Sequence, residues 1–279
     1  MARRLVDDGH DLVILKRAAS DLRRVRDLLP RVRTFDVDRD PLEVLFAQTK
    51  PNILLHCATN YGRNEEAPSL VEEANFFFPL KLLELAVAAK TTVFINTDTL
   101  LDKRISPYAA SKRKFADALG ERSSEIVAIN VAIEHFFGPD GGKWNFVSRM
   151  ASDLVSGVDR IALTPGEQRR DFIYIDDVVD AFMTLIQRSA TWSKGFYSYQ
   201  VGTGQNLSIR ELMTLLVELS GNKTRLDFGA VAYRPNEVME TRVDISGLTA
   251  LGWSPKTPFR EGLRKMMEAA RAEAGLKPL

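Results

Sequence analysis

Three side chains in the middle of the sequence have the types and spacing needed to move a proton to or from a carbonyl or hydroxyl group. Tyr108 and Lys112 stand four residues apart in SPYAASKRKF, so a helix there places both on one face. An ammonium beside a phenol favours the phenolate, which lets the phenol exchange a proton near neutral pH. Thr97, in FINTDTLL, ends the preceding apolar run and offers a hydroxyl to the same oxygen. A chance match is the alternative in a chain with six tyrosines, and the position after a predicted strand argues against it.

The residues around this trio predict alternating strands and helices. Short apolar runs typical of buried parallel strands alternate with segments of helical spacing. The predicted strands of the first half are 11–16, 33–37, 52–57, 92–96 and 125–133. The predicted helices are 2–8, 20–29, 41–50, 71–90 and 107–119. This rhythm predicts an α/β fold of the Rossmann-like, doubly wound type, built on a parallel sheet.

After Gly138 the alternation loosens, and the predicted elements are shorter. Helices are predicted at 146–156 and 209–220, a strand running into a helix at 169–186, a strand at 196–201, and a basic amphipathic helix near the end. We expect residues 1–137 to form a dinucleotide-binding domain. Residues 138–279 are expected to form a smaller α/β substrate-binding subdomain, with 171–200 returning to the first domain. Gly202-Thr203-Gly204 lacks a third glycine, so it is interpreted as a turn rather than a phosphate loop.

Composition argues against several classes of protein. The net charge of +1 gives no reason to expect nucleic acid or an anionic membrane as partner. No apolar run approaches the roughly 20 residues needed to span a bilayer. The three histidines, His10, His56 and His135, lack metal-ligand spacing, so no metal site is expected. Cys57 is the only cysteine, which rules out an internal disulfide and favours the cytoplasm.

The start of the sequence lacks the glycine-rich loop of a dinucleotide-binding fold. Such a fold opens with a strand and a G-x-x-G-x-x-G turn, whose helix N-terminus holds the pyrophosphate. Here Gly9 is the only glycine before Gly62. In the strand order 3-2-1-4-5-6 the lacking first strand is central, so 11–16 and 52–57 are expected to carry unpaired edges. The simplest expectation is that the natural product carries about 15 more residues upstream of Met1.

Several segments, in order, resemble the extended short-chain dehydrogenases/reductases. They are NILLHCATNYGR, FINTDTLL, SPYAASKRKF, IEHFFGPD, LTPGEQRRDFIYIDDVVDAF, VGTG and YRPNE. More narrowly, the chain resembles the NAD-dependent nucleotide-sugar epimerases, dehydratases and reductases, including the synthases of CDP-abequose and CDP-paratose. The resemblance covers essentially the whole chain. It implies a nicotinamide cofactor, a nucleotide-sugar substrate and a homodimer formed by paired helices.

The resemblance also implies roles for single residues. It makes a catalytic triad of Thr97, Tyr108 and Lys112. The implied cofactor-binding residues are Tyr108 and Lys112 again, with Arg17, Asp36, Val37, His56, Ala58 and Asn75. The implied substrate-binding residues are Thr99, His135, Arg170 and Arg234. An ordinary polar residue at the end of an element is the alternative for Asp36, His56 and Asn75.

Three kinds of position sharpen this interpretation. Related sugar 4,6-dehydratases have Thr-Asp-Glu, and Thr99 stands in place of that glutamate base, so dehydration is disfavoured.

Arg17 follows the first predicted strand, where a cation suits a 2′-phosphate, so NADP(H) is favoured over NAD(H). A solvated basic loop is the alternative there. Arg170 and Arg234 match arginines that hold the diphosphate, because guanidinium forks bind phosphate bidentately. Their alternative is a place on an ordinary polar surface.

Two functions therefore remain open. The first is an NAD(P)-dependent nucleotide-sugar reductase or epimerase acting at the sugar C4 carbonyl or hydroxyl. The second is a non-catalytic or truncated family member that binds a nucleotide sugar or a partner without turnover. The trio favours the first as the family function, whereas the lacking glycine loop favours the second for this polypeptide.

Overall fold

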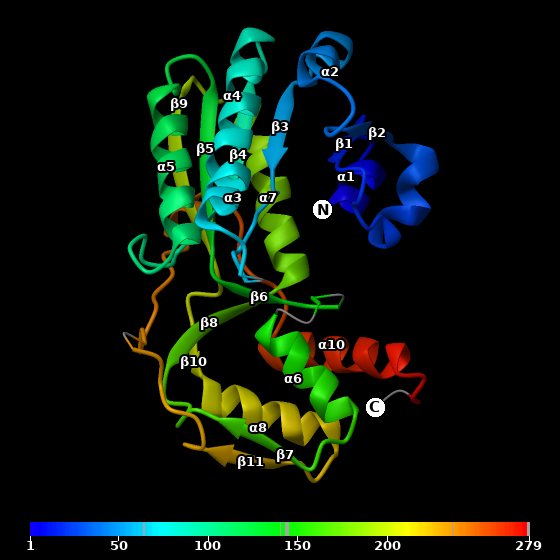
Figure 1. The fold of residues 1–279 in the computed structure, drawn as a ribbon, viewed down its shortest axis with the longest axis vertical. Helices are drawn as coiled ribbons and strands as arrows, with labels where there is room; N and C mark the ends of the chain where they lie inside the picture. Colours follow the sequence, from blue (N-terminus) through cyan, green and yellow to red (C-terminus); the bar gives the residue numbers. More distant parts are fainter. Residues whose placement is uncertain (64, 140, 143–144, 236, 278–279) are drawn as a thin grey trace. The chain divides into compact units, whose positions relative to one another are not determined.

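The computed structural model describes residues 1–63, 65–139, 141–142, 145–235 and 237–277 (Figure 1). Asp140 and Asn236, which belong to two of the motifs quoted above, lie outside the described residues. The chain folds into two units, the first made of 1–132 with 182–198 and the second of 133–181 with 199–279. In the described part of the chain, no helix has the length and apolar character required to cross a membrane.

The larger sheet of the first unit has the strand order β3-β4-β5-β9. The strands are β3 (Ile53–His56), β4 (Val93–Thr99), β5 (Val127–Ile133) and β9 (Gly195–Val201). β3 and β4 are parallel, with His56 opposite Asn96. The apolar runs that predicted these strands form the centre of the core, where Phe94, Ile126 and Ala128 are fully buried. β4 runs three residues past the predicted end at Asn96, so Thr97 and Thr99 lie inside the strand.

Two helices pack side by side over this sheet, α4 (Phe78–Ala88) and α5 (Pro107–Glu121) (Figure 1). α5 begins as predicted, because the Ser106 side chain accepts a hydrogen bond from the Ala109 amide and Pro107 stands in the first turn. The single helix predicted at 71–90 is three pieces: α3 (Pro68–Glu72), a π-helical segment at Glu73–Phe77, and α4. The π segment lies directly before Pro79, which has no amide hydrogen for the regular ladder.

The first unit also contains a separate two-stranded sheet. β1 (Val13–Lys16) and β2 (Arg33–Asp36) are parallel and pair with each other. α1 (Ala2–Asp7), a 3₁₀ helix at Arg23–Arg31 and α2 (Leu42–Thr49) complete this region. The 3₁₀ geometry replaces the α-helix predicted at 20–29, since the segment contains Pro30 and buries a single residue, Leu28. β1 and β3 are each the edge of a sheet, as expected for these two segments, so the predicted doubly wound sheet is divided in two.

The second unit is a smaller α/β body. One sheet has the order β10-β8-β6, from β6 (His135–Phe137), β8 (Arg169–Tyr174) and β10 (Asn206–Ser208). A parallel pair is made by β7 (Arg160–Leu163) and β11 (Arg225–Phe228). Its helices are α6 (Phe146–Val155), α8 (Ile209–Ser220), α9 (Ser246–Ala250) and α10 (Phe259–Glu273). α7 (Ile175–Ser189) begins in this unit, and its residues from Phe182 onward belong to the first unit. Leucines and methionines of α6, α8 and α10 form its core.

The Gly202–Gly204 segment is a turn, as predicted. The Asp171 carboxylate accepts hydrogen bonds from the Thr203 amide and hydroxyl and from the Gly204 amide, at 2.7–2.9 Å. A Cβ on Gly202 would come within 2.7 Å of that carboxylate, which explains the glycine. The amides of this segment are therefore used by the chain itself.

Candidate active site

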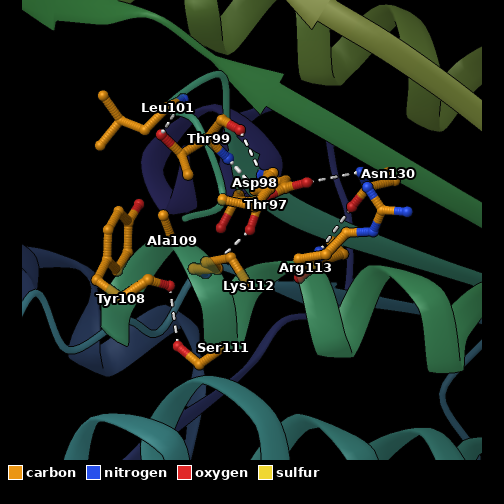
Figure 2. A network of polar contacts seen from close by, with 12 residues as sticks. Thr97, Asp98, Thr99, Leu101, Tyr108, Ala109, Ser111, Lys112, Arg113 and Asn130 are labelled. Carbon is orange, nitrogen blue, oxygen red and sulfur yellow. Dashed lines mark hydrogen bonds and ion pairs between the residues drawn. The ribbon is translucent and has the colours of Figure 1, made fainter. Parts of the chain in front are cut away.

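The end of β4 and the first turns of α5 bring the predicted trio together (Figure 2). The Lys112 ammonium donates a hydrogen bond to the backbone carbonyl of Thr97 at 2.9 Å. Lys112 is 2% exposed, although it carries a full charge when protonated. The contact to Thr97 thus uses the main chain, whereas the sequence analysis assigned the work to the Thr97 hydroxyl.

Tyr108 is half-buried and has Thr99 beside it (Figure 2). Burial raises the pKa of Tyr108 above its ordinary value, and the neighbouring Tyr61 raises it further. A hydrogen bond with the Thr99 side chain lowers the pKa of Tyr108 in part. The effect of Lys112 on Tyr108 expected from the sequence stays a prediction, since burial and Tyr61 are the largest influences on the pKa of Tyr108. The phenol is therefore held in its protonated form.

Lys112 is itself perturbed by its surroundings. Burial lowers its pKa to about 8, and the Asp98 carboxylate partly opposes that shift. Asp98 accepts hydrogen bonds from Lys103 Nζ at 2.7 Å and from Asn130 Nδ2 at 3.0 Å. Its side chain is 5% exposed. The buried Asp98 carboxylate thus helps Lys112 to stay protonated near neutral pH.

A chain of buried polar side chains crosses three strands near the trio, and of its members only His56 was predicted from the sequence. Asn130 donates to Asp98, and its Oδ1 accepts from Asn96 Nδ2 at 2.8 Å. Asn96 Oδ1 lies 3.0 Å from His56 Nδ1. An ionised carboxylate can only accept hydrogen bonds, so Asn130 must turn its Nδ2 toward Asp98 and its Oδ1 toward Asn96. Asn96 then turns its Oδ1 toward His56, and His56 must carry its proton on Nδ1 to donate to that oxygen. The only sequence signal was the presence of polar residues within otherwise apolar strands.

This orientation leaves an unprotonated nitrogen on His56. The ring is 3% exposed and burial lowers its pKa to about 4, so it stays neutral. Within the described residues His56 Nε2 is buried and has no hydrogen-bond partner. A buried acceptor without a donor costs about 1–3 kcal/mol. His56 ends β3, so this atom lies near the strand ends where a cofactor is expected.

Asn75 lies in the π segment and braces the loop after β3 against α5. Its Oδ1 accepts from the Asn60 amide at 2.8 Å, and its Nδ2 donates to the Asn60 carbonyl at 2.8 Å. The same Nδ2 donates to Ser111 Oγ at 3.2 Å, and that hydroxyl donates to the Tyr108 carbonyl at 2.9 Å. Asn75 is fully buried. Its amide therefore braces the loop and α5, and the cofactor contact that the resemblance implies for Asn75 stays a prediction.

The other predicted cofactor residues lie after parallel strands. Lys16, at the end of β1, pairs with Asp36 at the end of β2, Nζ to Oδ2 2.9 Å. The Lys16 hydrogen bond lowers the pKa of Asp36. Val37 donates its amide to the Lys16 carbonyl, while Arg17 is exposed. Ala58, also exposed, follows β3. Ligands of parallel α/β sheets bind at these strand ends.

Three predicted substrate residues belong to the second unit. Arg170 is 8% exposed and donates to Glu237 Oε1 at 2.7 Å and to the Arg169 carbonyl at 2.8 Å. The His135 imidazole Nδ1 lies 2.5 Å from Glu134 Oε1. Arg234 is exposed, and its carbonyl accepts from the Glu237 amide. An anion binding to Arg170 must therefore compete with Glu237. Among the described residues, no group of three His, Cys, Asp or Glu side chains is placed to hold a metal.

Comparison with known proteins gives consistent results for sequence and fold. Residues 1–202 match the NAD dependent epimerase/dehydratase family. The chain is 31% identical over 274 residues to CDP-abequose synthase of Salmonella muenchen, covering 94% of this chain and 90% of that protein. It is 27% identical over 298 residues to UDP-glucose 4-epimerase of Mycolicibacterium smegmatis, covering 96% and 93%.

Solved structures share the fold. UDP-glucose 4-epimerase from Thermotoga maritima, solved with UDP-glucose, superposes with a TM-score of 0.84 at 21% identity, over 98% of this chain and 94% of that one. UDP-glucose 4-epimerase of Thermus thermophilus, solved with NAD, gives 0.80 at 22% identity, over 96% and 94%. The predicted Rossmann-like α/β fold is thereby confirmed.

Proposed function

The chain belongs to the NAD dependent epimerase/dehydratase family, and from this premise we propose that it is a nucleotide-sugar reductase or epimerase acting at the sugar C4 carbonyl or hydroxyl. The observation that carries the proposal is the convergence of Tyr108, Lys112 and Thr99 at the end of β4. The similarity to CDP-abequose synthase over 94% of the chain supports a CDP-sugar as the first substrate to test. Catalysis is favoured over the non-catalytic alternative because the proton-transfer groups are all present.

Tyr108 is the proposed acid and base. Its raised pKa keeps the phenol protonated until a substrate oxygen arrives. In the direction of reduction the phenol donates its proton to the oxygen at C4, and in the direction of oxidation the phenolate takes that proton back. The hydroxyl of Thr99, already at Tyr108, is the proposed hydrogen-bond partner of the same oxygen. Dehydration is disfavoured, because a threonine at this position cannot remove a ring proton as a glutamate can.

The residues present fit a nicotinamide cofactor, which when bound supplies hydride chemistry. An ammonium has three N–H donors, and for Lys112 the Thr97 carbonyl is the one acceptor recorded within the described residues. The remaining donors suit the hydroxyls of a ribose. His56 Nε2 is a buried acceptor without a partner within the described residues, at the end of β3. We propose Arg17, Asp36, Val37, His56, Ala58 and Lys112 as the residues that contact the cofactor.

Finer properties of the family function follow from particular residues. Arg17, with Asp36 already paired to Lys16, favours NADP(H) over NAD(H).

Leu70 and Phe77 are 57% and 49% exposed on the helical segment beside α5, and a homodimer would cover them. Light scattering that gives a monomer would remove the dimer from this proposal. The single cysteine favours a cytoplasmic setting.

The proposal is tested by binding and turnover. Fluorescence titration with NADPH and NADH should show saturable binding, with NADPH tighter, and Arg17→Ser should abolish that preference. The chain should then reduce one of the CDP-, UDP-, GDP- or dTDP-linked 4-keto-sugars. Tyr108→Phe should lower kcat by about 10²–10⁴-fold while cofactor binding is retained. Saturable cofactor binding without turnover of any of the four would favour the non-catalytic alternative.

A further inference from the structure

A second tyrosine lies directly against the proposed acid. The ring centroids of Tyr61 and Tyr108 are 4.9 Å apart, with the planes inclined by 40°. The guanidinium carbon of Arg63 lies 4.5 Å from the centroid of the Tyr61 ring. Both distances fall in the range of favourable aromatic and cation–π contacts. Tyr61 therefore contacts both the reactive side chain and a cation, although the residue is 43% exposed.

The loop that carries these residues is held in one conformation. Asn75 binds the backbone of Asn60 through two hydrogen bonds of 2.8 Å and joins the loop to Ser111 of α5. The next residue but one, Gly62, donates its amide to Asn60 Oδ1 at 2.9 Å. Hydrogen bonds therefore hold both neighbours of Tyr61, Asn60 and Gly62. Because the buried Asn75 amide binds both the loop and α5, it links the position of Tyr61 to that of Tyr108.

Gly62 allows the chain to turn back after Tyr61. Its φ of +66° lies in the left-handed region, which side chains disfavour. A Cβ at this position would also meet Val71 Cγ2 at 3.1 Å. The conformation between Tyr61 and Arg63 thus favours glycine at position 62, and the guanidinium of Arg63 lies over the ring of Tyr61.

Resting on the proposed function, we propose that Tyr61 and Arg63 are positioning residues for Tyr108: the Tyr61 ring restricts rotation of the Tyr108 ring, and the Arg63 charge favours the phenolate during proton transfer. The groups that act on Tyr108 are Tyr61 and Arg63 from the loop and Asp98 and Thr99 from β4. No new chemical step is required. The proton still passes between Tyr108 and the substrate oxygen.

The charges around Tyr108 agree with this division of roles. Burial raises its pKa most, and Tyr61 and then Asp98 raise it further, while Thr99 and Arg63 lower it. Arg63 is exposed, so solvent and salt screen its charge. We therefore expect the packing effect of Tyr61 to exceed the charge effect of Arg63.

Fluorine NMR of the chain labelled with 3-fluorotyrosine tests the proposal without substrate or cofactor. The chain has six tyrosines, so Tyr→Phe variants assign the resonances. Tyr61→Leu should shift and narrow the Tyr108 resonance, because the ring gains rotational freedom. Arg63→Gln should shift the Tyr108 resonance at fixed pH, because the fluorine senses the loss of the nearby charge, and Arg63→Lys should restore it. Arg113→Gln, a matched exposed arginine on α5, should leave the Tyr108 resonance unchanged.

An unchanged Tyr108 resonance in folded Tyr61→Leu would overturn the packing part. If Tyr61→Leu does not fold, Arg63→Gln and Arg63→Lys still test the electrostatic part of the proposal. Both substitutions change an exposed side chain, so both variants are expected to fold. A Tyr108 resonance that does not respond to the charge at position 63 would overturn the electrostatic part. Where turnover is found, the rising limb of the oxidation rate with pH should move to higher pH in Arg63→Gln and return in Arg63→Lys. The NMR result stands even if no nucleotide sugar is turned over, so failure of the two proposals can be told apart.

Discussion

The two sheets of the first unit are held together by different forces. The β3-β4-β5-β9 sheet buries Phe94, Ile95 and Ile129 completely and carries a hydrogen-bonded polar chain inside. The strands of the β1–β2 sheet are at most half-buried, except at Asp36, and the surrounding segments are joined by exposed ion pairs. Burial stabilises far more than exposed ion pairs do. The proton-transfer groups thus lie on the well-buried β3-β4-β5-β9 sheet. The proposed cofactor residues Arg17, Asp36 and Val37 lie at the end of the less buried β1–β2 sheet.

The largest expected contrast is between matched phenylalanines of the two regions. Phe115 is fully buried beneath the β3-β4-β5-β9 sheet, so Phe115→Ala should lower the free energy of unfolding by about 3–5 kcal/mol. Phe35 of β2 is half-buried, so Phe35→Ala should cost about 1–2 kcal/mol. Urea denaturation measures both. Equal losses would mean that the two sheets form one equally packed core.

The next effect concerns the buried charge of Lys112. Its pKa is lowered to about 8 in the folded chain and is about 10.4 when unfolded, so the unfolded state binds more protons between these values. Stability should therefore rise with pH across this window, by roughly 3 kcal/mol at most. Lys112→Met should lack this rise. Parallel stability curves for the two proteins from pH 7 to 10 would contradict the assigned burial.

A smaller effect is expected from the polar chain behind the trio. Asn130→Leu removes one of the donors to Asp98, which keeps Lys103, and removes the acceptor of Asn96 Nδ2, which leaves that buried donor without a partner. An unpaired buried donor costs about 1–3 kcal/mol. Asn130→Asp should be worse than Asn130→Leu at pH 7, because it places a second carboxylate beside Asp98. Thermal unfolding distinguishes the three proteins, and a neutral Asn130→Leu would show that the chain of amides is not needed.

The smallest effect should come from an exposed ion pair of the β1–β2 region. Arg33 and Asp11 pair at 2.7 Å, but their side chains are 53% and 79% exposed. Arg33→Gln should leave the free energy of unfolding unchanged within error in 0.5 M salt, and nearly so at low salt. Denaturation at two salt concentrations checks this. A clear loss that persists in salt would show that this region depends on its ion pairs more than its exposure indicates.

Much of the first unit was predictable because its signals are local. The apolar runs ILLH and VFIN, the cap at Ser106 and the four-residue spacing of Tyr108 and Lys112 each lie within one element. The predicted helices failed where proline changed the hydrogen-bond pattern, at Pro30 and before Pro79. The residues missed in the site, Asn96, Asn130 and Tyr61, share a different cause. Asn96 and Asn130 meet each other and His56 across 34–40 residues of sequence, and Tyr61 meets Tyr108 across a loop, so no local pattern indicates these contacts.

Short-range chemistry in the sequence set the succession of strands and helices and placed a phenol and an ammonium on one helix face. Backbone geometry alone is sufficient for that, since a helix repeats every 3.6 residues. Only the folded arrangement sets the protonation and orientation of those groups. Burial raises the pKa of Tyr108 and lowers that of Lys112, the amide chain orients His56, and the braced loop brings Tyr61 to Tyr108. These effects depend on desolvation and on contacts between distant segments, which exist only once the chain is packed.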